Sequence, residues 1–200
     1  MALRVIAGKY RRRLLRTPHG LSTRPYTDRV RQVVFDRISD IVEFARVADV
    51  FSGVGTMGME ALSRGASSCV FFEGDQDVHA SLKENLEAIA PDERSICWRT
   101  DIRRTSFRPN GGEDCLPYSL IFFDPPYADV NQLLPGKPLS QSLRRLSKES
   151  ISSPDAVLIL RTPAKTDLEI FEGWELDERW DISTMIIWKL RKPSTAETSP

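Results

Sequence analysis

Apolar residues from position 46 onward occur in two kinds of segment that alternate along the chain. Short, nearly continuous apolar runs predict buried strands, and segments with apolar residues three or four positions apart predict amphipathic helices. Two later segments predict a terminal antiparallel pair. This alternation predicts an α/β fold with a mostly parallel, seven-stranded sheet and helices on both faces. The predicted strands are 47–51, 69–72, 95–98, 120–123, 157–160, 174–180 and 184–190, and the predicted helices are 58–64, 78–90 and 139–146.

The first part of the chain has a different pattern and is predicted to form a basic N-terminal extension. Segments 3–7 and 10–15 predict two short strands of a β-hairpin that turns at Gly8. Thr27 is placed to cap a helix over 28–41. The C-terminal end is rich in Pro, Ser and Thr, which favours disorder. The predicted division is an extension over 1–42, a main domain over 43–191 and a disordered tail over 192–200.

Charge is unevenly distributed along the chain, although the formal net charge is zero. Residues 1–37 contain ten basic and two acidic side chains, so the rest of the chain has a net charge of −8. A basic extension on an acidic body favours a polyanionic partner, while a solvated Arg-rich edge is the alternative. The candidate contacts to such a partner are Arg11, Arg12, Arg13, Arg24, Arg29 and Arg31.

Several other classes of site are not supported by the sequence. The three cysteines show no CxxC pairing, which favours reduced thiols over a disulfide framework or a zinc site. His19 and His79 are isolated and lack metal-ligand spacing, so we expect no metal. The sequence has no apolar run near the roughly 20 residues that span a bilayer. We expect a cytoplasmic protein without a membrane partner, with an Arg-rich transit peptide as the alternative reading of the N-terminus.

A glycine-rich loop follows the first predicted strand of the main domain. Gly53, Gly55 and Gly58 form a GxGxxG pattern, in which glycines allow a tight turn and close approach of a ligand. Glu73 ends the next strand, where a carboxylate can accept hydrogen bonds from ribose hydroxyls. Asp101 is a candidate acceptor for an adenine amine, or a solvated strand-end residue. The loop therefore predicts a dinucleotide or S-adenosylmethionine; a glycine turn that only packs helix on strand is the alternative.

The sequence Asp124-Pro125-Pro126-Tyr127 follows the apolar run 120–123 and predicts the catalytic part of the site. Two prolines stiffen the chain at the carboxyl end of a strand, where open α/β sheets bind their ligands. Asp124 and the Pro125 carbonyl can accept the hydrogens of a planar amine while Tyr127 covers its ring. Such a corner favours methyl transfer to an amine over hydride transfer by an NAD-dependent enzyme. An edge turn with an incidental acid is the alternative.

Together these segments resemble the bacterial 16S ribosomal RNA guanine-N2 methyltransferases, the RsmD-like family. The resemblance implies a Rossmann-like class I methyltransferase fold, S-adenosylmethionine as cofactor and a guanine amine of small-subunit rRNA as target. It also implies cofactor contacts for Asp49, Phe51, Ile102 and Thr27, and places Arg24, Thr27 and Arg29 near the cofactor and target base. The stretches that carry it are Arg4-Val5-Ile6-Ala7-Gly8, Arg24-Pro25-Tyr26-Thr27-Asp28-Arg29-Val30-Arg31, Asp49-Val50-Phe51-Ser52-Gly53-Val54-Gly55 with Gly58-Met59-Glu60-Ala61-Leu62-Ser63-Arg64-Gly65-Ala66, and Asp124-Pro125-Pro126-Tyr127.

The chain departs from this family pattern at positions that would frame a substrate. Tyr26 stands where Thr is usual, and Arg161-Thr162 follows the fifth predicted strand where Glu is usual. Segment 129–138 is an unfamiliar loop, and Trp180-Asp181 replaces a common Tyr-Gly pair. The residues alone leave two alternatives open: an adenine-amine methyltransferase acting on DNA or RNA, and a non-catalytic RNA-binding or assembly factor. We expect a monomer whose partner is ribosomal RNA or the small ribosomal subunit.

Overall fold

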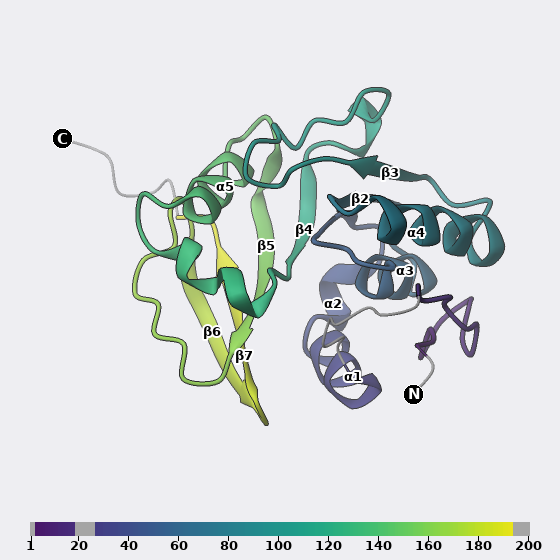
Figure 1. The fold of residues 1–200 in the computed structure, drawn as a ribbon, viewed down its shortest axis with the longest axis horizontal. Helices are drawn as coiled ribbons and strands as arrows, with labels where there is room; N and C mark the ends of the chain where they lie inside the picture. The colour runs from purple at the N-terminus through teal and green to yellow at the C-terminus, as the bar shows by residue number, and fades with distance from the viewer. Residues whose placement is uncertain (1–2, 19–26, 194–200) are drawn as a thin grey trace.

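The computed structural model describes residues 3–18 and 27–193, and seven strands of these residues form one sheet (Figure 1). The strand order is β3-β2-β1-β4-β5-β7-β6, with β7 antiparallel to both of its neighbours and the other pairs parallel. The predicted mostly parallel, seven-stranded sheet is therefore confirmed. The strands are β1 (Arg46–Val50), β2 (Ser68–Glu73), β3 (Ser95–Arg99), β4 (Tyr118–Phe123), β5 (Ser152–Pro163), β6 (Glu175–Ile182) and β7 (Met185–Arg191).

Helices cover both faces of the sheet, and Figure 1 shows α5 on the opposite side from α1, α2 and α3. Short 3₁₀ helices follow the third and fourth strands. The α-helices are α1 (Asp28–Arg37), α2 (Ser39–Val42), α3 (Thr56–Ser63), α4 (Gln76–Ile89) and α5 (Pro138–Leu146), and the 3₁₀ helices are η1 (Glu113–Cys115) and η2 (Tyr127–Leu133).

Each face of the sheet has its own hydrophobic core. Because successive residues of a strand point to opposite faces, Leu120 and Phe122 of β4 belong to one core, and Ile121 and Phe123 to the other. The first core is completed by α1 to α4 and the second by α5 and the segments around it. This two-sided burial explains why β4 appears in the sequence as a continuous apolar run.

The predicted elements of the main domain are present, and the differences lie at their ends. β5 begins at Ser152 rather than at 157, because its first residues are polar and give no apolar signal. The helix predicted over 28–41 is interrupted at Ile38, whose backbone (φ −115°, ψ 15°) is not helical, so that α1 and α2 are separate. Thr27 caps α1 as predicted, and its Oγ1 accepts a hydrogen bond from the Val30 N–H.

The predicted N-terminal hairpin is only partly correct. The chain doubles back, but the described residues of this region form a single bridge, between Arg4 and Leu14, and no regular strands. Other backbone groups bond to α3 instead: the Lys9 N–H donates to the Ser63 carbonyl at 2.8 Å. Gly8 has a φ of +78°, and a Cβ there would lie 1.8 Å from the Ser63 oxygen. The extension is thus shaped by the helix below it rather than by its own strand pairing.

The extension and the sheet share one core. Val5, Tyr10 and Leu15 are buried in the same cluster as residues of α3 and β4. The predicted boundary after residue 42 falls between α2 and β1 and remains a prediction. Most of the predicted disordered tail, residues 194–200, lies outside the described residues. Across residues 3–18 and 27–193, no helix is long and apolar enough to cross a membrane.

Candidate active site

The glycine loop connects β1 to α3, and its three glycines have different neighbours. A Cβ on Gly58 would lie 2.3 Å from the Phe71 ring, and a Cβ on Gly55, whose φ is +90°, would lie 2.6 Å from the Leu82 side chain. Both glycines are therefore required for packing. Gly53 has a φ of +56°, but the space where its Cβ would lie is open to at least 4 Å. Gly53 thus marks the part of the loop that a ligand can approach closely.

Glu73, at the end of β2, connects the loop to the start of α4. Its Oε2 accepts a hydrogen bond from the Gly53 N–H at 2.9 Å, and its Oε1 accepts one from the Asp75 N–H at 2.8 Å. The side chain is half-buried, at the edge of the open side of the loop. A carboxylate in this position suits the ribose of an adenosine-containing cofactor, so the glycine loop and Glu73 fit S-adenosylmethionine.

Asp49 and Phe51 support the loop from β1. Asp49 is buried, and its Oδ2 accepts a hydrogen bond from the Gly58 N–H at 2.8 Å, which fixes the junction of loop and helix. Burial raises the pKa of Asp49 to about 7. Phe51 has a φ of +62° and packs edge-on against Phe123, with ring centroids 5.4 Å apart. Asp49 thus contacts the loop through the Gly58 N–H. The cofactor contacts of both residues remain predictions.

The remaining predicted cofactor residues lie at strand and helix ends. Asp101 is exposed, and its Oδ1 accepts a hydrogen bond from the Arg103 N–H at 3.0 Å. Ile102 is buried, and its carbonyl accepts a hydrogen bond from the Ser142 hydroxyl at 2.9 Å. Thr27 is exposed at the start of α1. Their contacts with a cofactor are not tested by this geometry and remain predictions.

The Asp124–Tyr127 corner starts beside the glycine loop. The Asp124 N–H donates to the Val50 carbonyl at 3.2 Å, because β4 is the parallel neighbour of β1. Pro125 is buried, Pro126 is exposed and precedes η2, and Tyr127 is half-buried. The Tyr127 hydroxyl is buried without a hydrogen-bond partner in the described part of the chain. The corner therefore presents one carboxylate and one aromatic residue close to the cofactor loop.

Arg161, at the end of β5, contacts this corner and was not among the predicted site residues. Its Nε lies 2.5 Å from Asp124 Oδ1, and its guanidinium carbon lies 5.6 Å from the centroid of the Tyr127 ring. The pKa of Asp124 is raised to about 6, because burial raises it by more than the positive charge and hydrogen bond of Arg161 lower it. The sequence shows that Arg161 directly follows the fifth predicted strand. It does not show that this strand lies beside β4, so the contact between Arg161 and Asp124 could not be predicted.

A basic surface lies on the extension. Arg11, Arg12, Arg13 and Arg29 are exposed. Arg11, Arg12 and Arg29, three of the predicted RNA contacts, line one surface cavity of about 440 Å³. Arg24, another predicted contact, lies outside the described residues. The cavity is lined by Arg4, Val5, Ile6, Arg11, Arg12, Asp28, Arg29 and Gln32.

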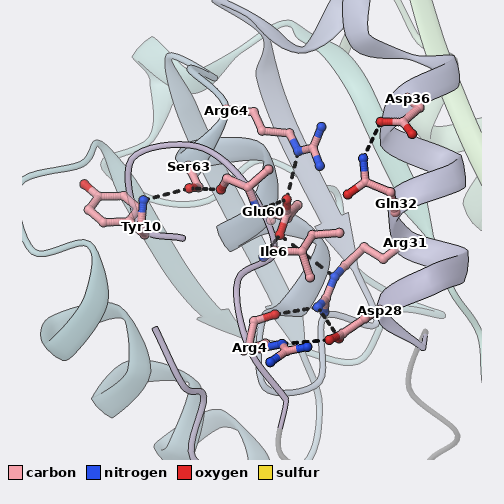
Figure 2. A network of polar contacts seen from close by, with 12 residues as sticks. Arg4, Ile6, Tyr10, Asp28, Arg31, Gln32, Asp36, Glu60, Ser63 and Arg64 are labelled. Atoms are coloured by element: carbon pink, nitrogen blue, oxygen red, sulfur yellow. Dashed lines mark hydrogen bonds and ion pairs between the residues drawn. The ribbon is translucent and has the colours of Figure 1, made fainter. Parts of the chain in front are cut away.

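Arg31 contradicts its predicted role as an RNA contact, because its side chain is fully buried. Its Nη2 donates to the Arg4 carbonyl and to Asp28 Oδ1, and its Nε lies 3.9 Å from Glu60 Oε2 (Figure 2). Desolvation lowers its pKa. A guanidinium without exposed surface cannot contact a phosphate, so Arg31 joins α1 to the extension instead.

Like Arg31, Glu60 is a buried charged residue whose structural role the sequence did not predict. It lies in α3, is fully buried, and accepts hydrogen bonds from the Ile6 N–H at 2.8 Å and the Ala7 N–H at 3.0 Å. Arg64, one turn later, donates to Glu60 Oε1 at 2.8 Å, and Figure 2 shows Arg31 and Arg64 on either side of the carboxylate. The helix that begins at the glycine loop is therefore tied directly to the basic extension.

The geometry agrees with comparisons to known proteins. Residues 3–188 match the protein family described as "Conserved hypothetical protein 95". The chain belongs to this family. Its relatives include the putative rRNA methyltransferase YlbH of Bacillus subtilis, 35% identical over 64% of this chain and 68% of that protein. The ribosomal RNA small subunit methyltransferase D of Escherichia coli K12 is 33% identical over 62% of this chain, and the match spans 60% of that protein, less than two thirds of its length. The predicted RsmD-like family is thereby confirmed.

Solved structures show the same fold. The Escherichia coli structure described as putative methyltransferase yhhF has a TM-score of 0.77 and 25% identity, covering 96% of this chain and 98% of that chain. A Pyrococcus abyssi tRNA (uracil-54, C5)-methyltransferase, solved in complex with S-adenosyl-L-homocysteine, has a TM-score of 0.61 and 18% identity, covering 95% of this chain and 44% of that chain. The fold of this RsmD-like chain is therefore that of the class I, S-adenosylmethionine-dependent methyltransferases, as predicted. Among the described residues, no cluster of three or more His, Cys, Asp or Glu side chains could hold a metal.

Proposed function

We propose that this chain transfers the methyl group of S-adenosylmethionine to the exocyclic amine N2 of a guanine in 16S ribosomal RNA. The observation that carries the proposal is the meeting of two motifs at neighbouring strand ends. β1 leads into the glycine loop, β4 ends at Asp124, and the two strands are adjacent and parallel. The hydrogen bond from Asp124 to Val50 places the acid beside the start of the loop.

The glycine loop and Glu73 would hold the adenosine part of the cofactor. Gly53 offers open space above its backbone, and Glu73 already lies within hydrogen-bond distance of the loop. S-adenosylmethionine supplies an electrophilic methyl group on a sulfonium centre. The role of the chain is then to place an amine nitrogen in line with that methyl group and to stabilise the charge that develops on the nitrogen.

Asp124 and Pro125 would orient the amine. The Asp124 carboxylate accepts one hydrogen and the Pro125 carbonyl accepts the other, which directs the nitrogen lone pair away from both acceptors. Asp124 is also placed to take the proton that the nitrogen loses. Its raised pKa, about 6, suits this task near neutral pH. Tyr127 offers a ring face on which the base can stack once it has left its own stack.

The basic cavity on the extension supports RNA as the carrier of the base. Arg11, Arg12 and Arg29 line the cavity, and contacts of this kind bind phosphates without reading sequence. The choice of guanine in 16S rRNA is supported by the named functions of the curated relatives rather than by the corner itself, which would also accept adenine.

The test is to incubate the protein with labelled S-adenosylmethionine and 16S rRNA or small subunits that lack the modification. The proposal expects N2-methylguanosine in the digested RNA, identified by nucleoside mass spectrometry. N6-methyladenosine would show an adenine-specific enzyme. Cofactor binding without transfer to any RNA would contradict the catalytic proposal and favour an RNA-binding or assembly factor.

Asp124→Ala is expected to lower kcat by about 100-fold or more, because the variant lacks the acceptor that stabilises the developing charge. The dissociation constant for S-adenosylmethionine, measured by calorimetry, should change by less than about threefold, since Asp124 acts on the amine. The matched variant Asp124→Asn keeps an acceptor without charge and should retain more activity. Near-normal activity in Asp124→Ala would exclude Asp124 as the acceptor that orients the amine.

A further inference from the structure

Arg161 lies where β5 meets the candidate active site. The parallel register pairs Phe123 of β4 with Leu160 of β5, so Asp124 and Arg161 are the next residues on neighbouring strands. Their side chains form an ion pair, with 2.5 Å between Arg161 Nε and Asp124 Oδ1. They are only 8% and 16% exposed. The rigid sheet therefore fixes this pair, unlike an ion pair between flexible surface side chains.

The same guanidinium also contacts the aromatic part of the corner. The Arg161 guanidinium carbon is 5.6 Å from the Tyr127 ring centroid, within the range of a cation–π interaction. Tyr127 begins η2, so Arg161 connects the ends of β4, β5 and the segment that follows the two prolines. A single cation thus contacts both residues that would receive the base.

The pairing distinguishes the two oxygens of Asp124. Arg161 Nε donates to Oδ1, and no group in the described part of the chain donates to Oδ2. The bond fixes the rotation of the carboxylate and leaves Oδ2 as the acceptor for an amine. A buried carboxylate without a cation beside it takes up a proton more readily, and a protonated acid would no longer accept on both oxygens.

The charges around Asp124 have opposing effects. Burial raises the pKa of Asp124 and Arg161 on β5 lowers it, and the net pKa is about 6. Asp49 on β1 is the nearby acid, and the negative charge of Asp124 contributes to the raised pKa of Asp49. Tyr127 contacts Arg161 from η2. Without Arg161, Asp49 and Asp124 would share a poorly solvated edge of the sheet with no cation between them. The pKa of Asp124 would then rise, so that it stays protonated up to a higher pH.

We propose that Arg161 is a positioning residue for methyl transfer, which keeps Asp124 ionised and turned so that Oδ2 meets the amine. The inference rests on the proposed function. Arg161 does not touch the reacting atoms and acts through Asp124 and Tyr127. Its loss should therefore change kcat and the pH at which activity falls, while cofactor affinity and the KM for RNA are retained.

The test compares Arg161→Gln and Arg161→Lys with the unaltered protein. Arg191→Gln is the control for loss of an Arg–Asp pair elsewhere in the sheet, because Arg191 pairs with Asp177 and lies opposite Val157, four residues before Arg161 on β5. For each protein, kcat and KM for RNA are measured between pH 5 and 9, together with cofactor binding by calorimetry.

Arg161→Gln is expected to lower kcat at pH 7 by about 10- to 100-fold, since a displaced acceptor loses its alignment with the amine. The acidic limb of its pH profile should move up by about one pH unit or more. Arg161→Lys should restore part of kcat and move the limb back toward that of the unaltered protein. Equal or higher kcat in Arg161→Gln would contradict the proposal, as would parallel loss of cofactor binding and activity.

A second measurement needs neither RNA nor turnover. The side-chain carboxyl ¹³C resonance of Asp124, assigned with Asp124→Asn, is titrated in the unaltered protein, in Arg161→Gln and, if that variant does not fold, in Arg161→Met, which is also uncharged. The proposal expects the pKa of Asp124 to rise in the variant. An unchanged titration would refute the role of Arg161 whatever the substrate, whereas absence of methyl transfer by the unaltered protein would refute the proposed function.

Discussion

Several ionisable side chains lie in the interior of this protein, each beside an opposite charge or a backbone N–H. Arg31 contacts Asp28 and lies near Glu60, and Arg161 contacts Asp124. Asp49 has only the Gly58 N–H as its hydrogen-bond donor among the described residues. A buried acid with one neutral donor keeps an unfavourable desolvation free energy when ionised. At the residue scale, Asp49 is therefore the position where stability depends most clearly on pH.

The pH dependence of stability is predicted to be weaker in Asp49→Asn. The pKa of Asp49 is raised in the folded state to about 7, so its contribution to stability is complete below the unfolded value near 3.8 and is lost as the pH rises through 7. The asparagine variant should gain roughly 2 kcal/mol relative to the unaltered protein between pH 5 and pH 8. Urea unfolding of both proteins at both pH values measures this difference. If the free energies of unfolding of the two proteins differ by the same amount at pH 5 and pH 8, the prediction is wrong.

The decisive element for the site is the loop that leads from β1 into α3. Gly58 packs directly on the Phe71 ring, whereas Gly53 borders open space. The same helix carries Glu60 and Ser63, which hold the extension through the Ile6 N–H and the Lys9 N–H. One helix thus connects the candidate cofactor loop at its start to the basic extension along its side.

Two glycine substitutions in this loop are expected to have different effects. Gly58→Ala should lower the free energy of unfolding by about 1–3 kcal/mol, because its Cβ would lie 2.3 Å from Phe71. Gly53→Ala has no such clash, so it should cost mainly the strain of a positive φ, about 1 kcal/mol. Its added methyl group should weaken S-adenosylmethionine binding more than its loss of stability explains. Denaturant unfolding and calorimetry separate the two effects; equal stability losses with unchanged binding in Gly53→Ala would contradict this assignment.

At the scale of the whole molecule, the basic extension is part of the folded body rather than an appended arm. Its Val5, Tyr10 and Leu15 lie in the core of the sheet, and Arg31 and Glu60 join it to α1 and α3. Removing the extension would therefore expose a core as well as remove charge. Substitution of exposed arginines tests RNA docking without this complication.

The triple variant Arg11→Gln/Arg12→Gln/Arg13→Gln is expected to bind RNA more weakly and with a smaller salt dependence. Each lost phosphate contact lowers the slope of log K against log salt by about 0.7–0.9, so the variant should lose about 2 units of slope. A control with equal charge loss replaces the exposed Arg144, Arg179 and Arg191, which lie on α5, β6 and β7. Filter binding at several salt concentrations gives both slopes, and an equal change in variant and control would exclude a specific docking role.

Local patterns in the sequence are enough to predict the sheet, its helices and the two motifs of the site. Strands buried on both faces give continuous apolar runs, and the GxGxxG loop and the acid–proline corner are defined by neighbouring residues. These features are local, so they can be predicted without knowledge of the fold.

Which charged residues face inward depends on how distant segments of the chain pack together. Arg31 has the same local signal as Arg29, but it is buried because the extension folds back across α1. Arg161 contacts Asp124 because β5 is the neighbour of β4, and Glu60 is buried because the extension covers α3. Such partners are distant in sequence and are brought together by strand order and helix packing, which no local pattern specifies.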